Sequence, residues 1–127
     1  MRLIVDTLRD KKGLDLLVLD LRQVSDVADY FVLCTGTSEP HVRALAGDLV
    51  ERLRAEGHRP WHVEGMGTLR WVLVDLVDIV VHVFRRDARE FYALERLWGD
   101  ADTTAFDDGE EDEDVVPAAG ELGGDGL

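Results

Sequence analysis

One short turn in the sequence has residues that could bind an anion. Thr35-Gly36-Thr37-Ser38 follows an apolar run and precedes a helical pattern. Backbone N–H groups at a helix N-terminus favour phosphate or carboxylate groups, so the turn is a candidate anion-binding site. It lacks the lysine of a P-loop and the spacing of a dinucleotide-binding motif. We therefore favour an ordinary helix start, in which Thr37 or Ser38 accepts a hydrogen bond from an exposed backbone N–H.

A pair of acidic residues is the second candidate for chemistry. Nucleotidyl transfer requires acidic side chains that hold divalent metals on the phosphates of the substrate. Asp75 and Asp78 are the close acidic pair near a predicted strand end. Two carboxylates on one face of a strand stand two residues apart, whereas these stand three apart across a predicted turn. This spacing argues against catalysis, and we expect a protein that is not an enzyme and needs no cofactor.

Histidine and cysteine spacing does not indicate a metal site. The four histidines and the single cysteine have no familiar ligand spacing. We interpret each histidine as structural, and the thiol as buried and unreactive because no activating base stands nearby in the sequence. These residues are His41, His58, His62, His82 and Cys34.

The charge is distributed unevenly along the chain. The net charge is −13, but residues 100–127 hold eleven acidic residues and neither lysine nor arginine, so residues 1–99 carry a net charge of only −2. Neither part has the basic stripe of a protein that grips nucleic acid through phosphates. We expect no direct sequence-specific nucleic-acid binding. If the protein acts near RNA, a basic protein is the expected intermediary.

The cellular setting follows from features at the N-terminus and from cysteine usage. The first residues contain no long apolar segment, and the chain has no run of about 20 apolar residues that could span a membrane. A single cysteine cannot form an internal disulfide, which fits a reducing compartment. We expect a cytoplasmic protein with no membrane contact.

The element that must position the candidate residues is the run from Trp71 to Phe84. Its residues are aliphatic or aromatic apart from Asp75, Asp78 and His82. Most of the aliphatic residues are β-branched, which favours strands over a buried helix. We predict a hairpin of strands 71–75 and 78–84, apolar on both faces and therefore covered on both sides by other layers.

The rest of the chain predicts a single α/β domain. Apolar periodicity predicts helices over 3–11, from the Thr35–Ser38 turn to Gly57, and over 87–98, with further strands at 14–21, 30–35 and 59–64. We expect one domain, residues 1–99, with a five-stranded mixed sheet flanked by helices. Residues 100–127 are too acidic and glycine-rich to pack, so we predict a disordered tail.

An ordered series of short motifs resembles the ribosomal silencing factor family, also called the Iojap family. The match runs from about Leu3 to Trp98, and its specificity comes from six pieces in the same order. They are residues 28–32 (ADYFV), 35–38 (TGTS) with His41-Val42, Glu64-Gly65, 71–76 (WVLVDL), 80–84 (VVHVF) and 91–98 (FYALERLW). The acidic tail lies outside this resemblance.

The resemblance implies a fold and a function. Members of this family have a fold related to nucleotidyltransferases but lack the catalytic acids. They bind the large ribosomal subunit through ribosomal protein fourteen at the subunit-joining face. By occupying that face they block association with the small subunit and repress translation during starvation. Some members are homodimers when free.

The hairpin supplies the residues that best match the family's docking surface. Tryptophan dominates interface energies, and acidic residues suit a basic ribosomal protein. The matched residues are Trp71, Asp75, Leu76, Asp78 and Phe84. Val77 stands where family members often have glycine. Because a β-branched residue resists positive φ, we expect the turn to depart from the common family geometry.

Two alternatives to this translation repressor remain open. One is a nucleotidyltransferase-like nucleotide-binding enzyme that uses the turn between Thr35 and Ser38. The other is a regulatory module whose acidic tail, residues 100–127, occupies a basic surface. Nucleotide binding lost on replacement of Gly36 would favour the first alternative, and a salt-dependent effect of tail deletion would favour the second.

Overall fold

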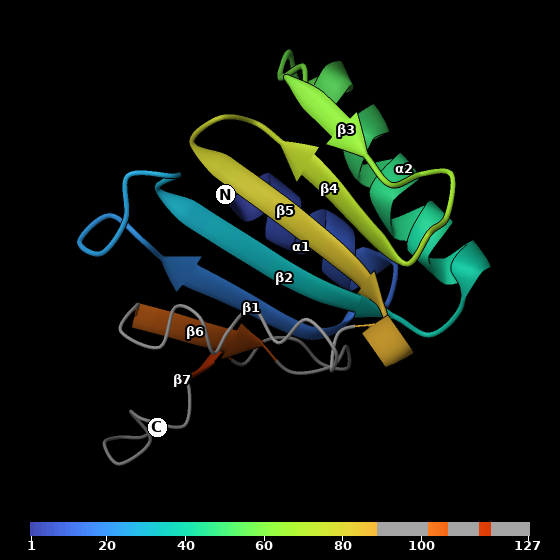
Figure 1. Cartoon of the computed structure of the whole chain (residues 1–127), viewed down its shortest axis with the longest axis horizontal. Coiled ribbons are helices and arrows are strands. Elements are labelled where there is room, and N and C mark those ends of the chain that lie inside the picture. Colours follow the sequence, from blue (N-terminus) through green and yellow to red (C-terminus); the bar gives the residue numbers. More distant parts are fainter. Residues whose placement is uncertain (89–101, 107–114, 118–127) are drawn as a thin grey trace.

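The computed structural model describes residues 1–88, 102–106 and 115–117. These residues form two helices and seven strands, which are joined by loops (Figure 1). The helices are α1 (Arg2–Asp10) and α2 (Glu39–Ala55). The strands are β1 (Leu14–Asp20), β2 (Tyr30–Gly36), β3 (His62–Glu64), β4 (Trp71–Asp75), β5 (Ile79–Arg85), β6 (Asp102–Phe106) and β7 (Val115–Pro117).

One mixed sheet contains every strand of the described residues, in the order β3-β4-β5-β2-β1-β6-β7. Only the central pair, β2 and β5, is parallel, with Leu33 opposite His82. The other neighbours are antiparallel. Figure 1 shows α1 and α2 together on one face of this sheet. The predicted α/β class with a mixed sheet is confirmed.

The strand count corrects the prediction made from the sequence. The sheet has seven strands rather than five, and both additional strands come from the stretch predicted as a disordered tail. β6 pairs with the edge of β1, with Leu17 opposite Ala105. The prediction of disorder is therefore wrong for residues 102–106 and 115–117, and the sheet extends past the boundary predicted at residue 99. The remainder of 100–127 lies outside the described residues.

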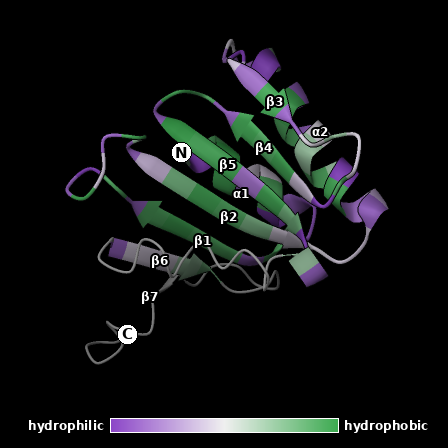
Figure 2. Cartoon of the chain, viewed as in Figure 1, coloured by the Kyte–Doolittle hydropathy of each residue, from purple (hydrophilic) through white to green (hydrophobic). Residues whose placement is uncertain are grey.

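Alternation along β4 separates the two faces of the sheet. Val72 and Val74 are fully buried against the helices, whereas Trp71, Leu73 and Asp75 are half-buried on the opposite face. Successive strand residues point to opposite faces, so this split follows directly from the sequence. Figure 2 shows that β4 and β5 are largely hydrophobic, in contrast to the hydrophilic residues of α2.

Helix α2 packs on the sheet through the apolar stripe that its sequence predicts. Val42, Leu45 and Leu49 are fully buried at helical spacing. Past the end of the helix, Gly57 adopts φ +87°, a value that glycine tolerates without a steric penalty. The other predicted helix, over 87–98, lies mostly outside the described residues, of which 86–88 are helical.

Candidate partner-binding hairpin

The hairpin formed by β4 and β5 places the predicted docking residues at its two ends. Trp71 lies opposite Phe84, and Asp75 lies opposite Val80. Four residue steps along a strand span about 13 Å. Any partner that contacts both Trp71 and the 75–78 turn must therefore cover the length of β4.

At the first end, the Trp71 indole is fixed by its neighbours. Its ring stacks on Phe84 with centroids 5.3 Å apart and planes inclined by 29°. Its Nε1–H donates a hydrogen bond of 3.0 Å to Nδ1 of His82. Phe84 is only 1% exposed. Phe84 therefore supports the Trp71 ring from the interior of the protein. It presents almost no surface of its own to a partner.

His82 is a buried histidine that holds the Trp71 side chain. It is 3% exposed and lies edge-on to Phe31, with ring centroids 4.6 Å apart. Burial lowers the pKa of His82 to about 4, so the imidazole is neutral near pH 7. Because Nδ1 accepts from Trp71, the proton is on Nε2, and Nε2 has no hydrogen-bond partner among the described residues. The sequence predicts a structural sheet histidine here. It does not reveal the hydrogen bond between His82 and Trp71, which lies two residues along β4 from Leu73, the residue opposite His82.

The loop before β4 fixes the backbone of Trp71. Gly65 adopts φ +93°, and a Cβ atom placed there would overlap the carbonyl oxygen of Trp71. The Leu69 N–H donates to the Gly65 carbonyl at 2.9 Å, and the Leu69 side chain is buried. Only glycine permits this close approach, so the loop and the strand start are packed as one unit.

At the second end, a tight turn of residues 75–78 is held by its own polar groups. Oδ1 of Asp75 accepts from the Val77 N–H at 2.7 Å, and the Leu76 N–H donates to the Ile79 carbonyl at 2.9 Å. The carbonyl of Asp78 accepts from Asp29 N–H at 2.8 Å. The turn is thus attached both to β5 and to the segment before β2.

Val77 adopts the backbone conformation that its side chain disfavours. Its φ is +78°, although β-branched residues rarely enter this region. We expected Val77 to resist positive φ, and the structure shows that the surrounding hydrogen bonds impose it. The side chain is 58% exposed, so the strained residue lies at the surface of the candidate site.

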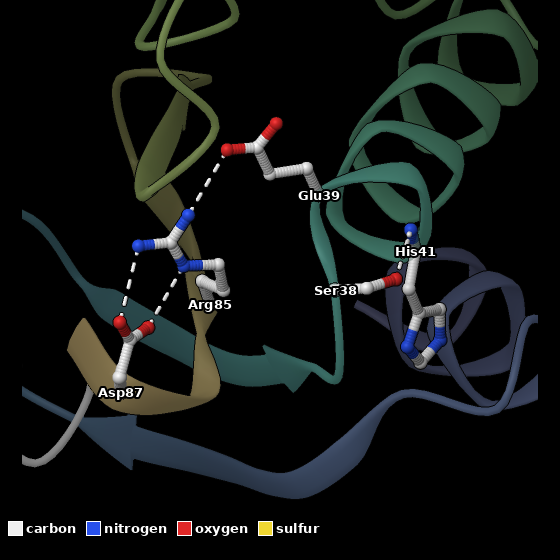
Figure 3. Close-up of polar contacts among 5 residues, drawn as sticks. All are labelled: Ser38, Glu39, His41, Arg85 and Asp87. Carbon is white, nitrogen blue, oxygen red and sulfur yellow. Dashed lines mark hydrogen bonds and ion pairs between the residues drawn. The ribbon is translucent and has the colours of Figure 1, made fainter.

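The predicted anion-binding turn is occupied by a histidine of the same chain. The Thr37 N–H donates to Nδ1 of His41 at 2.9 Å, and Nε2 of that ring donates to the Lys11 carbonyl at 2.8 Å. Ser38 caps α2, its Oγ accepting from the His41 N–H at 3.3 Å (Figure 3). Thr35 is buried, and a Cβ on Gly36 would crowd Val42. These contacts favour the interpretation as a capped helix start.

Next to this turn, Arg85 joins two elements through carboxylates. Its guanidinium contacts Glu39 at 3.0 Å and Asp87 at 2.8 and 3.1 Å (Figure 3). The Arg85 contact lowers the pKa of Asp87, and the same pairing raises the pKa of Arg85. A shallow depression lies here, lined by Thr37, Arg85, Arg86 and Asp87. Arg85, the cation in this depression, is already paired with the carboxylates of Glu39 and Asp87. The spacing of these residues in the sequence did not predict this pairing.

Other classes of site find little support in the part of the chain that the structure describes. No group of three or more histidine, cysteine or acidic side chains lies close enough there to hold a metal ion. Cys34 is buried, as predicted. Within the same ranges, no helix is both long and apolar enough to cross a bilayer.

Comparison with known proteins identifies the family. The sequence model of the family described as "Ribosomal silencing factor during starvation" matches residues 1–121. The chain belongs to the ribosomal silencing factor family. The family membership expected from the six motifs is therefore confirmed.

Relatives of this silencing factor share both sequence and fold. It is 46% identical to the ribosomal silencing factor of Bacillus subtilis over 100 residues, which are 79% of this chain and 85% of the relative. A mouse protein named for mitochondrial assembly of the ribosomal large subunit is 31% identical, over 76% of this chain and 43% of the mouse protein. A crystal structure from Chromobacterium violaceum is similar with a TM-score of 0.75 and 33% identity, covering 93% of this chain and 91% of that one.

Proposed function

We propose that this silencing factor is a non-enzymatic, cytoplasmic repressor of translation. It binds the large ribosomal subunit at the face that joins the small subunit and blocks their association sterically. Its partner there is ribosomal protein fourteen. The names of its relatives support this proposal, since they refer to silencing of ribosomes and, in mouse, to assembly of the large subunit.

The observation that carries the proposed docking surface is the combination of groups on the β4–β5 hairpin. Trp71 is half-buried and held by Phe84 and His82, so little side-chain freedom is lost when a partner covers it. Asp75 and Asp78 form no ion pair with the described residues. Carboxylates that lack an ion-pair partner attract a basic protein and orient its approach.

Binding to isolated subunits tests the proposal. Purified protein is sedimented with large or small subunits, and subunit joining is followed by light scattering. Trp71→Ala should weaken large-subunit binding by about 2–4 kcal/mol, the usual cost of truncating a tryptophan hot spot. Asp75→Asn keeps an acceptor for the Val77 N–H and removes only the charge, so its effect should grow as salt concentration falls.

Asp6→Asn is the matched control, because Asp6 is an exposed acidic residue on α1, on the opposite face of the sheet. This variant should bind and inhibit joining like the wild type. Thermal unfolding of each variant separates loss of the fold from loss of the contact. Unchanged binding by folded Trp71→Ala and Asp75→Asn would contradict the docking assignment. Wild-type protein that sediments with neither subunit would contradict the proposed function as a whole.

A further inference from the structure

Exposed apolar side chains gather at one end of the molecule. Among the described residues, six large hydrophobic side chains are exposed, and four of them belong to segments that meet the 75–78 turn. The largest of these is Trp61, at 72% exposure, followed by Val27 at 65% and Val77 at 58%. Met1 also lies at this end, where it lines a pocket together with Leu76, whereas Val24 lies in the loop between β1 and β2 and Met66 lies in the loop before Trp71. Such grouping is uncommon on a surface that only meets water.

Backbone hydrogen bonds bring these segments together. The Trp61 N–H donates to the Asp75 carbonyl at 2.8 Å, which places the backbone of Trp61 beside the turn. On the other side, the Asp29 N–H donates to the Asp78 carbonyl, which places the loop containing Val27 next to the same turn. Figure 1 shows the start of β3, the β4–β5 turn and the start of β2 at a common end of the sheet.

A pocket opens at the same end. It has a volume of about 300 Å³, enough for one large side chain. Its lining is mainly apolar and includes the turn residue Leu76. The lining residues are Met1, Leu3, Ile4, Leu53, His58, Arg59, Leu76, Asp78 and Ile79.

The carboxylates around this end outnumber the one guanidinium that lines the pocket, that of Arg59, and they fit a basic partner. Asp26 and Asp78 are exposed and Asp75 is half-buried, and none of the three forms an ion pair with a described residue. Exposed aromatic surface rimmed by unpaired carboxylates suits a protein that presents an apolar side chain between cations. A nucleic acid would be repelled by the same carboxylates.

We propose that the end of the sheet around Trp61 is a second contact on the ribosomal partner. In this inference, which rests on the proposed function, Trp61 is the aromatic anchor and the neighbouring pocket receives an apolar side chain of a basic ribosomal protein. The contact is separate from Trp71, since the two tryptophans lie at opposite ends of β4. The docking surface then extends along the whole hairpin.

Three variants test this second contact. Trp61→Ala should raise the Kd for purified large subunits at least tenfold, on the order of a hot-spot loss. Trp61→Phe should recover part of the affinity, because an aromatic ring still fills the contact. Asp6→Asn, at an exposed residue of α1 on the opposite face of the sheet, is again the control and should leave Kd within about twofold. Free energies of unfolding should be nearly equal for all, because Trp61 is exposed.

The outcomes separate this inference from the proposed function. A wild type that binds tightly together with a Trp61→Ala variant that binds equally well overturns the second contact and leaves the proposed function standing. A wild type that does not bind large subunits overturns both. Binding lost in Trp61→Ala but retained in Trp71→Ala supports the second contact and contradicts docking at Trp71.

Discussion

The two ends of the β4–β5 hairpin hold their surface groups in different ways. At one end Trp71 stacks on Phe84, donates to His82 and is backed by the 65–70 loop. At the other end Trp61 and Val77 are exposed, and the turn between the strands is held by hydrogen bonds and by the packing of Leu76 against the core. The same two strands thus present one anchor fixed in advance and one exposed apolar end.

The two ends therefore differ in what binding a partner would cost and contribute. A fixed side chain loses little conformational freedom on binding, so its contact costs less entropy. An exposed aromatic side chain contributes mainly by leaving water, and its removal should barely affect the fold. Variants at the Trp71 end should therefore change stability and binding together, whereas variants of Trp61 should change binding alone.

The largest expected effect is at Gly65. Gly65→Ala places a methyl group against the Trp71 carbonyl at a residue with φ +93°, and it should lower the free energy of unfolding by about 3 kcal/mol. Gly67→Ala in the same loop meets no atom within 4 Å and is the matched control. Urea denaturation measures both. Equal stability of the two variants would mean that the loop does not fix the start of β4.

The next effect is a pH dependence that originates at His82. Its pKa is about 4 in the native protein and 6.5 ordinarily, so between these values the unfolded chain binds a proton that the native protein does not. The contribution of His82 to stability is therefore complete above about pH 6.5 and falls as the pH drops toward 4. By about pH 5 the loss should reach about 2 kcal/mol.

Urea denaturation at about pH 7.5 and about pH 5 measures this loss. His82→Gln, which does not titrate, should lose about 2 kcal/mol less than the wild type over that interval. His58→Gln, at an exposed histidine, is the control and should behave as the wild type. A wild type and a His82→Gln variant with parallel pH profiles would show that His82 does not carry the effect.

A smaller effect is expected when only the indole N–H of Trp71 is removed. Trp71→Phe leaves Nδ1 of His82 without this donor, and an unsatisfied buried group costs about 1–3 kcal/mol. Trp61→Phe is the control, since that side chain is 72% exposed and its loss should be within about 0.5 kcal/mol. A double-mutant cycle with His82→Leu isolates the contact, and additive effects would argue against coupling.

The smallest effect is a gain at Val77. Val77→Gly relieves a β-branched residue at φ +78° and should raise the free energy of unfolding by about 1 kcal/mol. Val27→Gly is the control, an exposed valine without positive φ, and should bring no gain. Thermal unfolding detects both changes. A loss of stability in Val77→Gly would mean that the entropy of glycine outweighs the strain.

Patterns in the sequence predicted the elements whose formation depends on residues close to one another along the chain. The stripe of α2, its start at Ser38 and the β-branched hairpin strands all follow from periodicity and capping. The family membership also came from the order of short motifs, and the match to residues 1–121 confirms it. These features need no knowledge of distant contacts, because helix and strand periods are local properties.

Several features of the site could not be predicted because they depend on contacts between distant residues. β6 was missed because its five residues adjoin the acidic run 107–114, and its strand partners, β1 and β7, are not visible in its local pattern. The bridge from Arg85 to Glu39 joins residues 46 positions apart. The pairing of Trp71 with Phe84 requires the register of β4 on β5.

For this silencing factor, the sequence by itself determined the α/β class, the hairpin, the main helix and the family. The tertiary structure alone decided that His82 holds Trp71 and that Trp61 adjoins the 75–78 turn. It also imposed positive φ on Val77, against the preference of a β-branched residue. The physical reason is common to all three: strand register and cross-strand hydrogen bonds fix neighbours in space, and they override local preferences of about 1 kcal/mol.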